Sequence, residues 1–235
     1  MKIVLLLIGH LIGDFVLQPE CLAIKKKDSF KYQIIHAAIY AFVLGLVFIL
    51  YDSFVKALVL FIITFVLHLL IDYLRITISE NKNLRFQLIT FVCDQLIHII
   101  ILYIIALYLY SFNKIGNYLN IDFQKAKLVL GILLILSPAS VSIKHILNLY
   151  ETKDERNVDI CIDEDKIGSF IGKLERIIIV IFGIMTLYTS IALVFTAKSL
   201  ARFKQLENKP FAERYLVGTL LSLLFGLIAI IIIKT

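Results

Sequence analysis

Histidine and aspartate residues recur in the first four hydrophobic segments of this sequence. The first segment contains His10 and Asp14, the second His36, the third His68 and Asp72, and the fourth Asp94 and His98. Three of these are His/Asp pairs four residues apart, which on a helix places both side chains on one face, about one turn apart. Such a pair can bind one metal ion, or one member can bind the ion while the other orients it from behind. The spacing therefore indicates a metal site.

The composition predicts that the elements carrying these residues cross a membrane. The chain has 235 residues, of which 60% are hydrophobic and 18% charged, with a mean hydropathy of +0.91. A helix needs roughly 20 apolar residues to cross about 30 Å of hydrocarbon, and the apolar residues here fall into blocks of that kind. We predict an all-α, polytopic membrane helix bundle of about seven transmembrane helices. The predicted spans are Lys2–Leu17, Gln33–Tyr51, Val55–Ile76, Leu84–Tyr110, Lys127–Leu147, Leu174–Phe195 and Tyr215–Ile233.

The chain divides by content into two regions. Residues 1–110 form a four-helix membrane core that contains the His/Asp cluster, and residues 111–235 add three further membrane helices. The connection 151–172 holds seven acidic residues against three lysines or arginines up to Lys166. We expect it to be a solvated loop with little fixed structure.

Positive charge in the connections predicts the orientation. The Pro19–Tyr32 and Thr77–Arg85 connections are basic, which places both in the cytoplasm and the N-terminus outside. The Lys198–Arg214 connection is also strongly basic, yet strict alternation places it outside. Either one segment does not fully span, or this stretch is an interfacial helix. The net charge of +6 reports topology and attraction to anionic lipid, so the expected partner is membrane lipid rather than nucleic acid.

All seven polar residues are predicted to lie in the cytoplasmic leaflet. The first and third segments carry theirs toward the end, and the second and fourth carry theirs toward the beginning. An aspartate at mid-helix costs on the order of 3 kcal/mol on insertion scales, so such residues face a bundle interior or a wet cavity and mark function.

Histidine with carboxylate is a ligand set for zinc, manganese or iron. The predicted metal ligands are His10, Asp14, His36, His68, Asp72, Asp94 and His98. Seven candidates exceed the four of a closed zinc site, so one or two ions are both possible, with zinc as the first choice. Asp14, Asp72 and Asp94 are also the candidate catalytic residues, as ligands or as a general base. The alternatives are a proton or ion pathway and polar contacts that hold helices together. Bis-histidine haem ligation would leave the aspartates without a role.

The motif residues also carry a resemblance. The run Gly9-His10-Leu11-Ile12-Gly13-Asp14-Phe15-Val16-Leu17-Gln18, followed by His36, His68-x3-Asp72 and Asp94-Gln95-x2-His98, resembles the bacterial integral-membrane family known as domain of unknown function 3307. The resemblance covers roughly Met1–Tyr110. It implies a multi-pass protein of the bacterial cytoplasmic membrane and the motif positions, and it implies no activity.

Two functions fit this sequence. The first is a membrane-embedded metal-dependent hydrolase that acts on a lipid or lipid-linked substrate, such as a lipid phosphate, at an intramembrane His/Asp site. The second is a proton or divalent-metal transporter that uses the same cluster as a relay or ion site. The order of the pairs reverses between the third and fourth segments, a partial echo of an inverted repeat, but the last three segments carry no equivalent cluster. A scaffold for partner proteins would leave the cluster unexplained.

Overall fold

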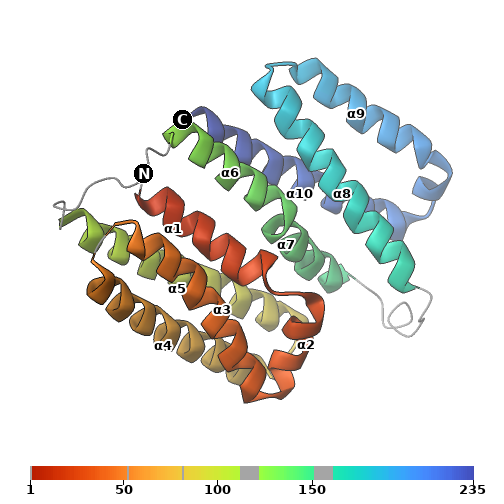
Figure 1. Ribbon diagram of the computed structural model, residues 1–235. Helices are drawn as coiled ribbons and strands as arrows, with labels where there is room; N and C mark the ends of the chain where they lie inside the picture. Colours follow the sequence, from red (N-terminus) through yellow and green to blue (C-terminus); the bar gives the residue numbers. More distant parts are fainter. Residues whose placement is uncertain (1, 52, 81, 112–121, 151–160) are drawn as a thin grey trace. The chain divides into compact units, whose positions relative to one another are not determined.

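The computed structural model describes residues 2–51, 53–80, 82–111, 122–150 and 161–235, and in this part of the chain all regular structure is helical (Figure 1). The elements are α1 (Lys2–Leu11), a π-helical turn η1 (Ile12–Val16), α2 (Glu20–Asp28), α3 (Phe30–Ile49), α4 (Phe54–Ser79), α5 (Leu84–Ser111), α6 (Phe123–Leu136), α7 (Pro138–Leu147), η2 (Asn148–Tyr150), α8 (Cys161–Ile184), α9 (Tyr188–Ala201), η4 (Phe203–Glu207) and α10 (Lys209–Lys234). The predicted all-α bundle is confirmed.

Five stretches of the described chain are long and apolar enough to cross a membrane. They are Phe30–Ile49, Phe54–Ser79, Leu84–Leu109, Phe123–Leu147 and Lys209–Lys234. The pair formed by Lys2–Val16 and Glu20–Asp28, bent by 78°, makes a sixth if it is counted as one broken span. Large apolar side chains on these helices are exposed, for example Phe42 at 61% and Ile62 at 51%. Such faces indicate a multi-pass membrane protein, because lipid covers them without any need for polar groups.

The predicted span Leu174–Phe195 was wrong as a continuous helix, and its loss accounts for one of the missing spans; the other is the first segment, which counts as a span only if the bent pair is taken as one. After α8, the Leu187 N–H donates to the Phe182 carbonyl at 2.8 Å and the Thr186 N–H donates to the Gly183 carbonyl at 3.3 Å. Thr186 has a positive φ of 60°. Together these form a Schellman motif, which satisfies the last carbonyls of a helix and turns the chain away.

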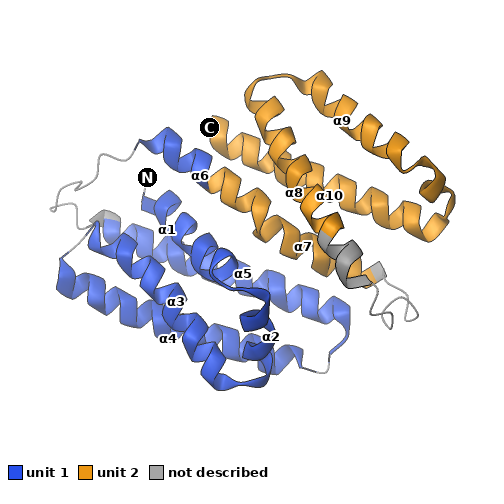
Figure 2. Cartoon of the chain, turned by 45° about the vertical axis from the view of Figure 1, so that its right-hand side comes forward, with its two compact units in different colours: residues 1–129 blue, residues 130–235 orange. Residues whose placement is uncertain are grey.

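As a result α8 and α9 form an antiparallel hairpin. They lie side by side in Figures 1 and 2, and Lys198 of α9 binds Glu175 of α8 with an N–O distance of 2.8 Å. Lys198 and Glu175 lie about equally far from the turn on their two helices. The basic stretch after α9 therefore returns to the end of the hairpin at which α8 begins.

Two connections that were expected to be loops contain helix. Residues 161–172 form the first half of α8, so that part of the predicted acidic loop 151–172 was wrong, while residues 151–160 lie outside the described residues. The Pro19–Tyr32 connection is largely α2. Both expectations rested on charge, which does not exclude a helix; the lysines of the 19–32 connection have helix propensities close to that of leucine.

The chain forms two compact units, residues 1–129 and 130–235 (Figure 2). In unit 1, helix α3 packs against α1, α2 and α4, and α5 packs against α1 and α4. Helix α1 approaches α3 closely at Gly9 and Gly13, where an added Cβ would lie 2.9 Å from Leu44 Cδ2 and 3.1 Å from Tyr40 Cα. This small-xxx-small pattern permits close packing of helix backbones in membranes. The apolar core consists of Leu6, Tyr40, Leu44, Phe48, Ala57, Leu60, Leu102, Ile105, Ala106 and Leu109.

Unit 2 is built on α10, which packs against α7 and α8. Its buried core is Ile135, Ile179, Val180, Ile191, Ala229 and Ile230. Arg176 is 2% exposed beside this core. Its guanidinium donates to the Ile135 carbonyl at 2.6 Å and to the hydroxyls of Ser140 and Ser222 at 2.6 and 3.3 Å. The Ile135 carbonyl lies in the last turn of α6, just before the break between α6 and α7.

Candidate metal centre

The structure brings all seven predicted site residues into one connected cluster in unit 1. They come from α1 (His10), η1 (Asp14), α3 (His36), α4 (His68, Asp72) and α5 (Asp94, His98), and their exposure ranges from 0% to 7%. The cluster lies where α1 ends and α3 begins, and Tyr40 belongs to the apolar core and also contacts His10 and His68 of the cluster.

Asp14, His36 and His68 form the tightest group. Their ligand atoms all lie within 4.8 Å of one another. His36 Nε2 lies 3.1 Å from Asp14 Oδ1 and 3.1 Å from His68 Nε2. In a tetrahedral zinc site with bonds of about 2.0–2.1 Å, neighbouring ligand atoms are about 3.3 Å apart. Two of the three separations are close to this value, so the three residues could hold a metal ion.

Hydrogen bonds alone satisfy this group poorly. His36 Nε2 faces both Asp14 Oδ1 and His68 Nε2, and it is also 3.5 Å from Asp72 Oδ2. A ring nitrogen carries at most one proton, so it can donate to only one of these atoms. The Nδ1 atoms of His36 and His68 are buried without a hydrogen-bond partner. The convergence of Nε2 atoms and carboxylate oxygens is the arrangement that a cation, rather than a proton, would satisfy.

The π-helical turn positions Asp14. The Leu17 N–H donates to the Ile12 carbonyl at 2.8 Å, an i→i−5 bond that replaces the α-helical pattern. Asp14 lies inside this turn and contacts His36 of α3, while the hydrogen bonds of His10 go to Tyr40 and Gln95. His10 and Asp14, the first predicted pair, thus both point into the cluster, but they form hydrogen bonds with different residues. Such turns occur frequently at functional sites.

Gln95 fixes the protonation of His10. The Gln95 amide Nε2 donates to Asp14 Oδ2 at 3.0 Å and to Asp94 Oδ2 at 3.1 Å, and ionised carboxylates only accept. Gln95 Oε1 therefore faces His10 Nε2 at 3.2 Å, and that nitrogen must donate. His10 Nδ1 then accepts from the Tyr40 hydroxyl at 3.3 Å. Both ring nitrogens of His10 are used, so this side chain orients its neighbours.

His98 presents a free lone pair. Its Nδ1 lies 2.9 Å from the Asp94 backbone carbonyl, which can only accept, so Nδ1 carries the proton. Its Nε2 is buried without a partner. A histidine that donates from Nδ1 to a backbone carbonyl is set to bind a metal through Nε2. The His98 ring lies 4.6 Å from that of His68 and 5.7 Å from that of His10, measured between ring centroids.

Two cations neutralise two of the three aspartates. Lys26 Nζ donates to Asp72 Oδ2 at 2.9 Å, and both side chains are almost fully buried. Arg75 Nε lies 4.0 Å from Asp72 Oδ1 and 3.8 Å from Asp94 Oδ2. Within the described chain, no lysine or arginine makes an ion pair with Asp14. With neutral histidines the cluster has one negative charge in excess, and a cation at the Asp14 group would balance it.

The comparison with protein families identifies the region that carries this cluster. A family model described as "Protein of unknown function (DUF3307)" matches residues 3–130, a little over half of the chain. The chain belongs to this family. The matched DUF3307 region coincides with unit 1 and contains all seven cluster residues. No curated protein and no solved structure matches the chain.

Within the DUF3307 region, four residues that contact the predicted ligands were not among the site residues predicted from the sequence. Tyr40 stacks on His68 with ring centroids 3.8 Å apart, and its spacing of four from His36 is a signal that could have found it. Arg75, three residues after Asp72, and Gln95, within the motif, carry similar signals. Lys26 carries none, because nothing distinguishes it from the lysines on either side.

Proposed function

We propose that this chain is a membrane-embedded metal-dependent hydrolase that acts on a lipid or lipid-linked substrate. One observation carries the proposal: three buried ligands, Asp14, His36 and His68, converge within 4.8 Å. Catalytic zinc sites have three protein ligands and keep a fourth position open, whereas structural sites are closed by four. Two imidazoles and one carboxylate form a ligand set of the catalytic kind. We take zinc as the ion, since it favours nitrogen and carboxylate oxygen in tetrahedral geometry.

The remaining residues have distinct roles in this proposal. A bound ion supplies a Lewis acid that activates a water and polarises a substrate oxygen. Asp72 acts as the general base, because its Oδ2 lies 3.5 Å from the Nε2 atoms of both His36 and His68. Lys26 holds that carboxylate in place. Asp14 is a ligand rather than a base.

The other aspartate and the outer histidines support this set. Asp94 accepts from Gln95 and faces Arg75, whose positive charge would stabilise negative charge that develops on a substrate. His10 orients Gln95, which in turn orients Asp14. The free Nε2 of His98 is a ligand for a second ion.

The surroundings of the site support a lipid substrate. The helices that carry the cluster expose apolar side chains along much of their length, so a molecule reaching the cluster from the side would come from the bilayer. A lipid with a scissile ester, amide or phosphoester near its headgroup suits a site placed in one leaflet. We place the protein in the bacterial cytoplasmic membrane, with the site in the cytoplasmic leaflet.

The first test is metal content. The protein is purified in mild detergent through a tag without histidine, and zinc, manganese and iron are measured by plasma mass spectrometry. We expect one or two equivalents of metal, which His36→Ala and His68→Ala lose. The matched control is His145→Ala, since His145 lies in α7, outside the cluster. No metal in the folded wild-type protein, or equal metal in all variants, would contradict the proposal.

The second test separates catalysis from transport. Asp72→Asn combined with Lys26→Met, which leaves no unpaired buried charge, should keep its metal and lower hydrolysis of phospholipids or lipid phosphates by about 10²–10⁴-fold, the usual contribution of a general base. Wild-type protein in liposomes should give no flux of zinc or protons. Flux that depends on the cluster, without hydrolysis of any lipid class, would favour a transporter instead.

A further inference from the structure

A hollow lies in unit 2 where α9 turns into α10. It has a volume of about 430 Å³ and is lined by Phe195, Thr196, Ser199, Leu200, Phe203 and Leu206. Four of these side chains are apolar and two carry hydroxyls. The lining residues all come from the end of α9 and from η4, so one short segment builds the whole surface.

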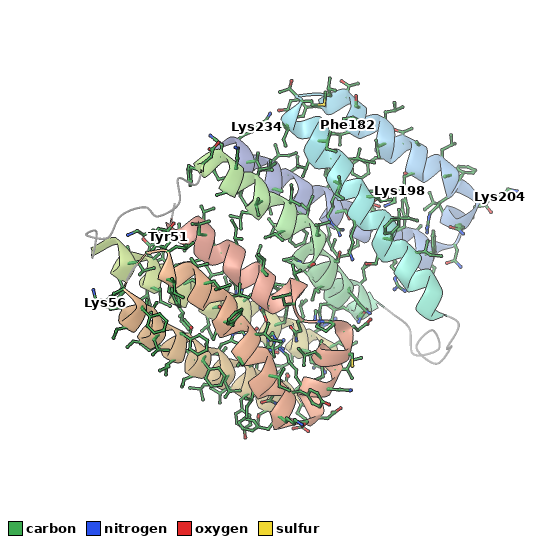
Figure 3. The ribbon with its side chains drawn as sticks, viewed as in Figure 1. Tyr51, Lys56, Phe182, Lys198, Lys204 and Lys234 are labelled. Carbon is green, nitrogen blue, oxygen red and sulfur yellow. The ribbon has the colours of Figure 1, made fainter. Side chains whose placement is uncertain are left out.

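The segment that lines this hollow also carries two cations, Arg202 and Lys204. Arg202 lies over the ring of Phe211, 5.8 Å from its centroid, and Lys204 is exposed and extends away from the helices (Figure 3). Neither makes an ion pair with a carboxylate in the described chain, whereas the neighbouring Lys198 and Lys209 each pair with a glutamate. Arg202 and Lys204 therefore carry charge for an outside partner, and they outnumber the one carboxylate of η4, Glu207.

The hairpin places this corner on the basic side of the protein. Because α8 and α9 run in opposite directions, the chain after α9 returns to the side from which α8 starts. With the N-terminus outside, the bent α1–α2 pair counted as one span, and α3, α4, α5 and the α6–α7 segment crossing in turn, that side is the cytoplasm. The basic stretch then agrees with the positive-inside rule, and it faces the leaflet that is rich in anionic lipid.

We propose that this corner binds one anionic phospholipid of the cytoplasmic leaflet. Its phosphate is held by Arg202 and Lys204 with the hydroxyl of Ser199 nearby, and an acyl chain lies along Phe195 and Leu200. A zwitterionic lipid would fill the apolar hollow equally well but would leave the two cations less well neutralised. The charge complementarity therefore selects an anionic headgroup. The site lies in unit 2, and it does not depend on the function proposed for the metal centre.

The experiment uses the absence of tryptophan from the sequence. Phe203→Trp introduces a single fluorophore at the hollow, and the full-length protein is reconstituted in bilayers that contain brominated phosphatidylglycerol or brominated phosphatidylcholine. Quenching against mole fraction gives the relative binding constant of the two lipids. We expect phosphatidylglycerol to be preferred. Arg202→Gln and Lys204→Gln should each lower the preference about fivefold, since one cation near anionic lipid contributes about 1 kcal/mol and 1.4 kcal/mol is a factor of ten.

The control removes the same charge elsewhere. Lys27→Gln combined with Lys31→Gln takes two exposed cations from α2 and the start of α3, and it should leave the preference unchanged. Quenching by phosphatidylcholine should stay constant in every variant, which shows that the fold is retained. Three results would overturn the proposal: equal quenching by both lipids, an equal fall in the control, or no quenching by either lipid because protein covers the corner.

Discussion

The buried ion pair between Lys26 and Asp72 gives a prediction about stability that tests the geometry of the cluster. The N–O distance is 2.9 Å, and the two side chains are 4% and 3% exposed. Lys26→Met leaves the carboxylate with only Arg75, at 4.0 Å. Asp72→Asn leaves the ammonium of Lys26 buried without an opposite charge. Lys26→Met therefore leaves a buried charge that is only weakly compensated and Asp72→Asn leaves one without its partner, whereas the double change leaves neither.

The expected magnitudes follow from burial. Removing one partner of a buried pair costs about 3–5 kcal/mol of stability, while replacing both partners is often close to neutral. We expect each single variant to lose about 3–5 kcal/mol in the free energy of unfolding. The double variant should lose less than either, so the coupling energy should reach at least about 3 kcal/mol.

The assay is unfolding by sodium dodecyl sulfate in mixed micelles, followed by the near-ultraviolet circular dichroism of the 11 tyrosines. A chelator is present throughout, so that metal binding does not contribute. The control cycle is Lys209→Met with Glu213→Gln, a pair at 4.0 Å whose side chains are 85% and 69% exposed. Its coupling should be about 0.2–1 kcal/mol. A coupling energy for Lys26 and Asp72 as small as that of the control would refute the buried pair.

Two further predictions test the packing and the topology. Gly13→Ala should destabilise unit 1 by about 1–3 kcal/mol, because the added Cβ would lie 3.1 Å from the Tyr40 backbone. The control is Gly168→Ala, whose Cβ would meet nothing within 4 Å and which should be neutral or slightly stabilising. Equal effects of the two substitutions would contradict the close approach of Gly13 to Tyr40. In a chain without its three native cysteines, a membrane-impermeant thiol reagent should label Lys204→Cys from the cytoplasmic side and Lys234→Cys from the opposite side. Labelling of both from one side would contradict the hairpin and the crossing of α10.

The existence of the cluster could be predicted from the sequence, because charged residues in lipid must find one another. Three aspartates within apolar segments are costly to expose to lipid, so they are expected to face a common interior of the bundle. The spacing of four residues within each pair then indicates which face of the helix points into the interior. The choice of ligands could not be predicted in the same way. His10 and His36 look equivalent in the sequence, and only the bonds of Gln95 and Tyr40 show that both nitrogens of His10 are used.

The broken sixth span shows a different limit. Helices commonly end with a glycine or asparagine in the left-handed conformation, and here that position is held by Thr186, a β-branched residue that rarely adopts it. No local pattern marks the stop. The tertiary packing of α8 along α10 has overridden the residue preference. In the sequence, Lys26 contributes only to the positive charge of the Pro19–Tyr32 connection. Its burial beside Asp72 depends on where α2 packs, which the sequence does not show.

The wide separation of the cluster residues along the chain has a consequence for biosynthesis. Asp14 accepts from Gln95, 81 residues later, and Asp72 binds Lys26 across 46 residues. At about 5–20 residues per second, roughly 4–16 s pass between the synthesis of Asp14 and that of its partner. During that interval His36, made 22 residues after Asp14, is the cluster partner that the Asp14 carboxylate can already reach. We therefore expect unit 1 to reach its final packing only after α5 has been made, since α5 carries Gln95.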